Sequence, residues 1–184
     1  LPKDVGCTVF NAATCAAVSQ AVREGMPLIQ RIVTVTGKGV AKPQNFLVRI
    51  GTTFGQVVEA AGGLREDVWK VLSGGPMMGV AQPNLEAPVV KFVNAILCLT
   101  QADNGEREDP VCFRCGKCVE ACPMHLQPLY FYRYGSNRNL SQLTRYRIAD
   151  CIECGCCAYV CPGKVPLVAA IREGKAMVKE GKAK

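Results

Sequence analysis

Apolar and polar residues alternate in several short segments of the first hundred residues, a pattern typical of strands with one buried face. Residues 28–40 (LIQRIVTVTGKGV) alternate in this way and then turn at the GKG of residues 37–39, and residues 44–51 (QNFLVRIG) repeat the pattern. We therefore expect these two segments to pair as a hairpin. Residues 67–75 (DVWKVLSGG) and 94–100 (NAILCLT) are expected to form a third and a fourth strand.

Two other segments of this region have the spacing of helices. Residues 11–24 (NAATCAAVSQAVRE) are rich in helix-forming residues, and either Asn11 or Thr14 can cap their N-terminus. A second helix is expected after Thr52 or Thr53, because the apolar residues that follow share one face: Phe54, Val57, Val58 and Ala61. Two strands, a helix and further strands predict a small α+β domain of the β-grasp type.

The composition limits the class of protein. Of the 184 residues, 49% are hydrophobic and 20% are charged, which is typical of a globular chain with room for one ordinary domain or two small ones. No segment approaches the roughly 18 apolar residues of a membrane-spanning helix, so we expect no transmembrane segment. The formal net charge of +7 indicates an acidic partner, an anionic membrane surface or nucleic acid, although metal-bound thiolates would lower that charge.

The twelve cysteines indicate either a disulfide scaffold or a metal protein, and their spacing separates the two classes. Eight of them form two copies of the pattern C-x2-C-x2-C-x3-C-P, which is the ligand pattern of [4Fe–4S] ferredoxins. The first run contains Cys112, Cys115, Cys118 and Cys122, and the second contains Cys151, Cys154, Cys157 and Cys161. The sequence therefore predicts two iron–sulfur clusters.

In two-cluster ferredoxins, three cysteines of each run bind one cluster and the fourth binds the other. The predicted sets are Cys112, Cys115, Cys118 and Cys161 for cluster 1, and Cys151, Cys154, Cys157 and Cys122 for cluster 2. Two alternatives are weaker. Structural zinc uses pairs of C-x2-C knuckles and needs no third cysteine at the same step. Disulfides between cysteines three residues apart would be strained.

Four cysteines and the single histidine lie outside these sets. Cys156 would break the regular step if it replaced a neighbour, so we interpret it as a small side chain near a cluster. Cys7, Cys15 and Cys98 lie in apolar sequence without histidines or lysine clusters to activate them, and they are expected in the core. His125 is interpreted as a residue of the surface or of the cluster surroundings, because the thiolate count is already complete.

The cysteine runs lie in a part of the chain whose pattern is helical. The polar residues 101–109 (QADNGERED) indicate a linker, residues 110–173 are expected to form a mainly α-helical two-cluster ferredoxin domain, and residues 174–184 a basic tail. Aromatic and arginine side chains alternate between the runs: Tyr130, Phe131, Tyr132, Tyr134 and Tyr146 with Arg133, Arg138, Arg145 and Arg147. This favours aromatic packing beside a solvated basic face, or docking of an acidic electron carrier, over binding of nucleic acid.

These motifs together resemble a known family. Residues 34–63 (TVTGKGVAKPQNFLVRIGTTFGQVVEAAGG) resemble the soluble-ligand-binding β-grasp (SLBB) domain. Residues 72–79 (LSGGPMMG) and both cysteine runs resemble the C subunit of the Rnf complex, a membrane-associated ferredoxin:NAD oxidoreductase. The resemblance implies an SLBB-like domain over residues 29–100, preceded at residues 1–28 by the last helix of a nucleotide-binding domain. Leu1 in place of an initiating methionine agrees with a piece of a longer protein.

The resemblance also implies a function. Electrons would pass one at a time through two [4Fe–4S] clusters, between a flavin and NADH site and the other Rnf subunits, with the chain peripheral at the cytoplasmic face of the cell membrane. FMN and NADH are expected only in a preceding domain, because no Gly-rich phosphate loop opens a helix in this sequence. The chain alone is therefore not expected to oxidise NADH. The alternative is a cobalamin-reducing or corrinoid-binding protein with the same two domains.

Overall fold

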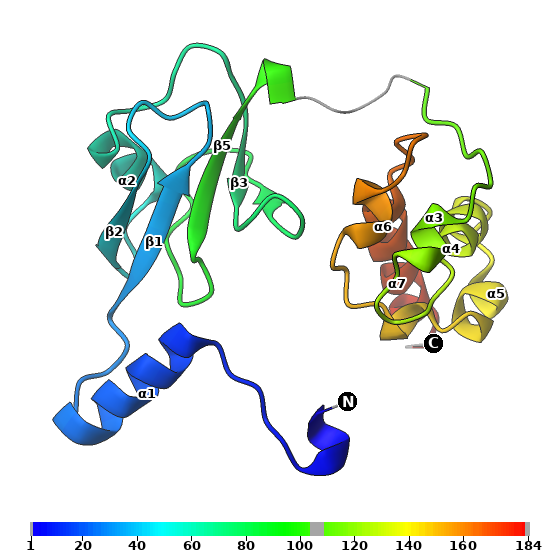
Figure 1. The fold of residues 1–184 in the computed structure, drawn as a ribbon, viewed down its shortest axis with the longest axis horizontal. Coiled ribbons are helices and arrows are strands. Elements are labelled where there is room, and N and C mark those ends of the chain that lie inside the picture. The colour runs from blue at the N-terminus through cyan, green and yellow to red at the C-terminus, as the bar shows by residue number, and fades with distance from the viewer. Residues whose placement is uncertain (1, 104–108, 183–184) are drawn as a thin grey trace. The chain divides into compact units, whose positions relative to one another are not determined.

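The chain folds into two compact units that we describe separately (Figure 1). The computed structural model describes residues 2–103 and 109–182, so most of the linker expected at residues 101–109 lies outside the described residues, as do residues 183 and 184 of the expected tail. Unit 1 contains Leu1–Gly74 and Ala81–Thr100, and unit 2 contains Gly75–Val80 and Gln101–Lys184.

Unit 1 is built on a mixed sheet of five strands in the order β2-β1-β5-β3-β4. Its strands are β1 (Gln30–Thr36), β2 (Gln44–Arg49), β3 (Val68–Ser73), β5 (Ala95–Thr100) and β4 (Val80–Ala81), whose first residue belongs to unit 2. Strand β1 pairs antiparallel with β2 and parallel with β5, and β5 pairs antiparallel with β3. The four strands expected from the sequence are confirmed, whereas the two-residue β4 was not predicted.

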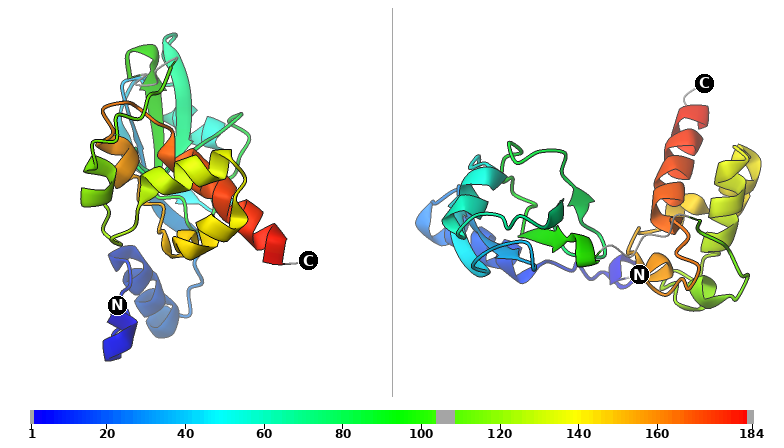
Figure 2. Two further views of the ribbon diagram at one scale, coloured as in Figure 1. Left: turned by 90° about the vertical axis from the view of Figure 1, so that its right-hand side faces the viewer. Right: turned by 90° about the horizontal axis from the view of Figure 1, so that it is seen from above.

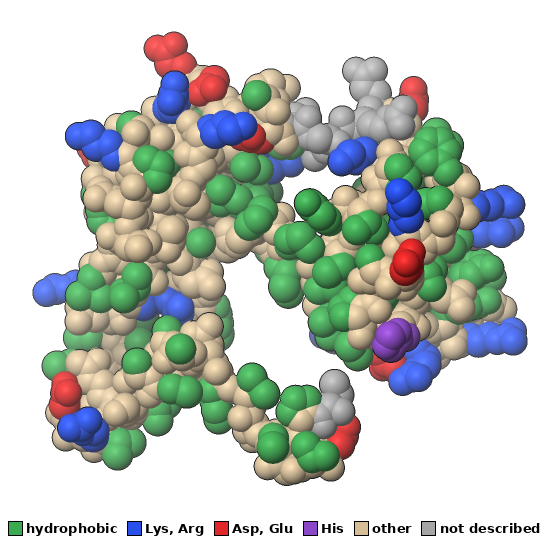
Figure 3. Space-filling model, in the orientation of Figure 1, with side chains coloured by type: hydrophobic (Ala, Val, Ile, Leu, Met, Phe, Trp, Pro, Cys, Tyr) green, Lys and Arg blue, Asp and Glu red, His purple; other side chains and the backbone are tan. Residues whose placement is uncertain are grey.

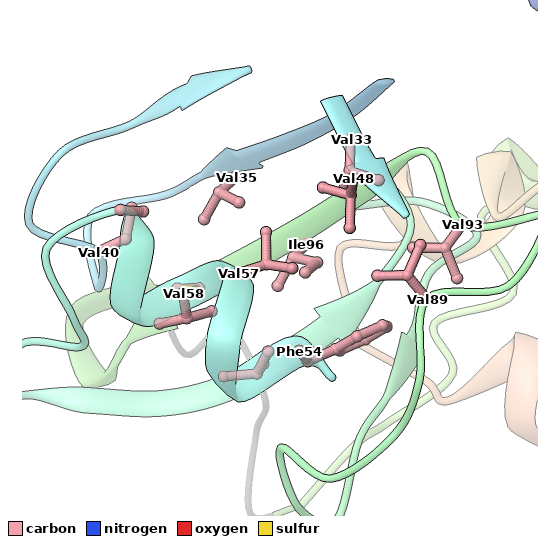
Figure 4. Close-up of a cluster of buried hydrophobic side chains, with 13 residues drawn as sticks. Val33, Val35, Val40, Val48, Phe54, Val57, Val58, Val89, Val93 and Ile96 are labelled. Atoms are coloured by element: carbon pink, nitrogen blue, oxygen red, sulfur yellow. The ribbon is translucent and has the colours of Figure 1, made fainter. Parts of the chain in front are cut away.

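Helix α2 (Phe54–Ala60) covers this sheet because its apolar face completes the core. Thr53 is its N-cap: the Thr53 hydroxyl accepts a hydrogen bond from the Gln56 N–H, and the Gln56 side chain accepts one from the Thr53 N–H across 3.0 Å. Figure 4 shows the side chains of helix α2 directed toward strand residues such as Ile96. These residues form one apolar cluster, as the α+β prediction requires.

Two glycines let the β1–β2 turn lie directly against strand β5. Gly39 donates its N–H to the Cys98 carbonyl oxygen across 3.0 Å. A Cβ atom on Gly37, whose φ is +109°, would lie 2.1 Å from the same oxygen. Any side chain at Gly37 would therefore separate the hairpin from β5.

Helix α1 (Ala12–Glu24) begins at Asn11 and ends before Gly25, as expected. The Asn11 side chain accepts a hydrogen bond from the Ala13 N–H across 2.9 Å, and Gly25 has φ 67°. Unlike α2, this helix has no buried residue.

Unit 2 is helical. Its elements are η2 (Gln101–Asp103), α3 (Lys117–Glu120), α4 (Pro128–Ser136), α5 (Leu140–Arg145), η3 (Ile148–Asp150), α6 (Cys156–Tyr159) and α7 (Leu167–Lys182). Helices α4, α5 and α7 lie side by side (Figure 2), and they enclose Phe131, Leu143 and Ile171. The predicted helical class of this domain is confirmed. The expected boundary at residue 173 falls inside α7, which continues and buries Val178 in the same core.

None of the helices in the described part of the chain combines the length and apolar character needed to cross a bilayer.

Candidate metal centres

The first candidate site is a cavity between the beginning of the first cysteine run and the end of the second. Four thiols line it, three from the first run and one from the end of the second: Cys112, Cys115, Cys118 and Cys161. Leu129 and Tyr132 of α4, together with Val165 and Leu167, supply much of the apolar wall. The structure thus brings together the four residues predicted for cluster 1.

The second candidate site repeats this arrangement with the other four thiols: Cys122, Cys151, Cys154 and Cys157. Its apolar wall includes Leu126, Phe131, Val168 and Ile171. Cys156 does not line the cavity, although it adjoins two residues that do. The four residues predicted for cluster 2 therefore also lie together, and ligation of a cluster by either set stays a prediction.

The two sites are related by a constant offset of 39 residues. The offset joins each cysteine of the first run to its counterpart in the second, and it also joins wall residues such as Leu129 to Val168 and Tyr132 to Ile171. The backbone repeats as well, because equivalent residues have left-handed φ: Arg114 and Glu153, Gly116 and Gly155, His125 and Lys164. Unit 2 is therefore built from two structural repeats.

Backbone N–H groups approach several of these sulfurs. Leu126 N–H donates to Cys122 Sγ across 3.3 Å, and Glu153 N–H donates to Cys151 Sγ across 3.4 Å. Hydrogen bonds to sulfur stabilise a thiolate and are one of the means by which proteins tune iron–sulfur clusters.

Burial has the opposite effect on the same thiols. It raises the pKa of the Cys157 thiol to about 12, and it also raises the pKa of Cys118 and of Cys151. Without bound metal these three side chains are neutral thiols at pH 7. Metal binding must therefore displace their protons.

The chemistry of the donor set fits an iron–sulfur cluster. Each cavity offers four sulfur donors on otherwise apolar walls, as [4Fe–4S] ligation requires, and the N–H groups of Leu126 and Glu153 are directed at two sulfurs of the second cavity. Within the described residues, no group of three or more His, Cys, Asp or Glu side chains is arranged to hold a single metal ion. The four thiols of each set instead line one cavity.

The remaining cysteines and the histidine have different environments. Cys98 is fully buried in β5, as predicted, and burial raises its thiol pKa to about 11. Cys7 and Cys15 are exposed, so the expectation that they belong to the core was wrong: helix α1, which carries Cys15, buries none of its residues. Cys156 is partly buried and shares a hydrogen bond with the Cys154 thiol, and His125 is exposed.

An ion-pair network beside the second cavity was not expected from the sequence. Glu153 lies between two cations of α7, at 2.7 Å from Lys175 Nζ and 3.0 Å from Arg172 Nε. The hydrogen bond from Lys175 lowers the pKa of the Glu153 carboxyl, which is therefore charged at neutral pH. The signal that could have pointed to it is the 39-residue offset, at which Glu153 replaces Arg114.

Comparison with known proteins identifies both domains. Residues 32–81 match the SLBB domain, and residues 111–165 match the 4Fe-4S dicluster domain. The chain is 51% identical over 128 residues to the C subunit of the proton-translocating ferredoxin:NAD(+) oxidoreductase complex of Clostridium ljungdahlii, an alignment that covers 70% of this chain and 28% of that protein.

Two further relatives extend the likeness. Identity is 43% over 140 residues to the C subunit of the Na(+)-translocating ferredoxin:NAD(+) oxidoreductase complex of Acetobacterium woodii, covering 76% of this chain and 31% of the relative. It is 40% over 177 residues to the C subunit of the ion-translocating oxidoreductase complex of Cronobacter sakazakii, covering 96% and 23%. The chain thus spans less than a third of the length of these relatives.

The fold and the two four-cysteine cavities define an iron–sulfur protein of the two-cluster ferredoxin class, joined to an SLBB domain. Within that class, the chain belongs to the family of the C subunits of ion-translocating ferredoxin:NAD oxidoreductase (Rnf) complexes. This relationship favours the electron-transfer interpretation over the corrinoid-binding alternative.

Proposed function

We propose that this chain is an electron relay in which each four-cysteine cavity holds one [4Fe–4S] cluster. Such a cluster, when bound, supplies a centre that takes up and releases one electron at a time. The observation that supports the proposal most directly is the gathering of eight cysteines into two sets of four around separate cavities.

The two cavities are neighbours, as a relay in series needs. Cys118 lines the first and Cys157 the second, yet both pack in one apolar cluster. The sets also cross, since each run contributes its fourth cysteine to the other cavity. Each run therefore fixes the position of both sites.

The protein's own groups have three tasks at these sites. The thiolates hold the metal, the N–H groups of Leu126 and Glu153 stabilise negative charge on sulfur, and the apolar walls exclude water. A low-polarity, preformed surrounding keeps the rearrangement that accompanies a change of charge small.

The wider role of the chain follows its relatives. We place the relay between a flavin and NADH site in the part of the protein outside this chain and the other subunits of an Rnf-type complex, in a peripheral position at the cytoplasmic face of the membrane. The relatives' names describe ferredoxin:NAD oxidoreductases that translocate ions. The isolated chain is expected to carry electrons without oxidising NADH.

A basic surface on unit 2 fits an acidic electron carrier better than nucleic acid. Residues 121–149 contain four arginines and no aspartate or glutamate. Arg133, Arg138 and Arg145 are exposed beside a group of tyrosines, Tyr130, Tyr134 and Tyr146, whose rings pack with centroids 4.9–5.8 Å apart. The tyrosine rings pack against each other, so the arginines are the groups available to contact a partner. Figure 3 shows basic side chains projecting from this unit.

The test is the iron and acid-labile sulfide content of the chain, purified or reconstituted without oxygen, with EPR of the reduced protein. The proposal requires about eight iron and about eight sulfide per chain and the signals of two interacting spins. One or two zinc ions per chain without sulfide would make the cysteine runs structural and would refute the relay.

A further inference from the structure

One contact beside the second cavity distinguishes the second repeat of unit 2 from the first. Glu153 Oε1 is 2.7 Å from Lys175 Nζ, and Glu153 Oε2 is 3.0 Å from Arg172 Nε. Lys175 Nζ also donates to the Cys151 carbonyl oxygen across 2.6 Å. Two side chains of α7 therefore hold the loop between Cys151 and Cys154 at three atoms.

The first repeat cannot form this contact. At an offset of 39 residues, Arg114 replaces Glu153, Arg133 replaces Arg172 and Ser136 replaces Lys175. Two arginines repel each other, and serine supplies no cation. The loop from Cys112 to Cys115 is also more open, since both of these cysteines are exposed whereas Cys151 and Cys154 are partly buried.

The contact adds a side-chain restraint to a backbone conformation that both repeats share. Arg114 and Glu153 both have left-handed φ, 55° and 54°, so the loop adopts this conformation in the first repeat without the contact, whereas in the second repeat the ion pairs also hold Glu153. In that conformation its N–H points to Cys151 Sγ. Ion pairs that involve partly buried groups and charge-assisted hydrogen bonds are strong enough to maintain such a loop.

We propose that Glu153, Arg172 and Lys175 form a clamp that positions the Cys151–Cys154 loop and makes the two cluster sites unequal. The clamp makes the second site hold its cluster more firmly and sets the charge around it, while the first site stays the open one. Glu153 is a positioning residue in this scheme. The inference rests on the proposed function, because it concerns how the chain holds the two clusters.

The first test is the release of iron to a chelator from the anaerobically reconstituted chain. The wild-type protein should lose iron in two phases of similar size, the slow one from the second site. Glu153→Gln keeps the size of the side chain but removes its charge, and it should accelerate the slow phase about fivefold or more while leaving the fast phase unchanged. Lys175→Met should do the same. Arg114→Gln, at the equivalent position of the first repeat, is the matched control and should leave the slow phase unchanged.

The second test measures how the charge of the clamp changes the midpoint potentials of the clusters, rather than how rigidly the loop is held. The clamp carries one net positive charge, and Glu153→Gln raises it to two, which favours the form with the extra electron. One of the two midpoint potentials should therefore become more positive in Glu153→Gln and more negative in Lys175→Met. A purely structural role would not give shifts of opposite sign.

The outcomes separate the two levels of the proposal. If the wild-type chain incorporates no iron and sulfide, the relay and the clamp both fail. If it carries two clusters but Glu153→Gln and Lys175→Met leave both the slow phase and the potentials unchanged, the clamp alone is refuted. An equal acceleration of both phases in Glu153→Gln would also refute it, because the clamp acts on one site.

Discussion

Val111 and Gly163 lie in backbone contact, one just before Cys112 and the other just after Cys161. The Val111 N–H donates to the Gly163 carbonyl oxygen across 3.3 Å, and a Cβ atom on Gly163 would lie 1.8 Å from the Val111 carbonyl oxygen. Only glycine permits this approach. The contact joins the beginning of the first run to the end of the second, which is where Cys161 meets the other three thiols of the first cavity.

Gly163→Ala should therefore disable the first site selectively. The added methyl group must push Val111 away and move Cys112 from Cys161, so the iron content should fall by about half, with the second site retained. Gly135→Ala in α4 is the control, because its added Cβ meets only the Ala170 carbonyl oxygen at an ordinary 3.6 Å. Full iron content in Gly163→Ala would contradict the role given to this contact.

The crossed cysteine sets predict which substitutions behave alike. Cys122→Ser should resemble Cys154→Ser in its EPR spectrum and iron loss, because both line the second cavity, and it should differ from Cys115→Ser. Each of these variants should also weaken the fold around the other site, since each run serves both. Cys156→Ser should keep both clusters. A Cys122→Ser protein with two intact clusters would disprove the crossed arrangement.

Cys98 predicts a pH dependence of the stability of unit 1. Burial raises its pKa from 9.0 to about 11, so the unfolded chain loses this proton at lower pH than the folded chain does. The stabilisation is complete below pH 9 and is lost as the pH rises toward 11, by about 2 kcal/mol. Urea unfolding of the wild type and Cys98→Ala, followed across this range, should show a difference in free energy of unfolding that shrinks at high pH. A constant difference would contradict this assignment.

The basic surface of unit 2 predicts salt-dependent electron transfer with an acidic carrier. Exchanging Arg133, Arg138 and Arg145 together for glutamine should slow second-order electron transfer from a small acidic iron–sulfur protein by about tenfold at low ionic strength, with little effect at high salt. Exchanging the exposed Lys42 and Arg49 of unit 1 is the control. Equal rates for the wild type and the triple variant at low salt would exclude this surface as the docking site; binding to anionic vesicles instead would assign it to the membrane.

The features that the sequence predicted well are those decided by neighbouring residues. Cap residues such as Asn11 and Thr53 act within one helical turn, so their positions follow from short motifs. Ligand spacing likewise restricts how the first three cysteines of a run can surround a cluster, and the structure gathers the thiols around two cavities, whereas ligation by the crossed sets stays a prediction.

The features that escaped prediction depend on contacts between distant residues. Strand β4 has two residues, too few for a pattern. The network of Glu153 joins residues 19 and 22 positions apart, which only the packing of α7 brings together. The same packing overrides the expectation of a basic tail at residues 174–182, which rested on the lysines of this segment: helix α7 continues through it and places Val178 against the core.

Each cavity takes cysteines from both runs, and this constrains when the two sites can form during synthesis of the chain. Cys161, the fourth thiol of the first cavity, is 43 residues beyond Cys118, the third. The second cavity has Cys122 early, but its other three thiols follow only at Cys151, Cys154 and Cys157. Neither set is complete until almost all of the region has left the ribosome. The proposed insertion of both clusters is therefore expected late in biosynthesis, and a chain truncated before Cys151 would leave the first run without Cys161 and open to oxidation.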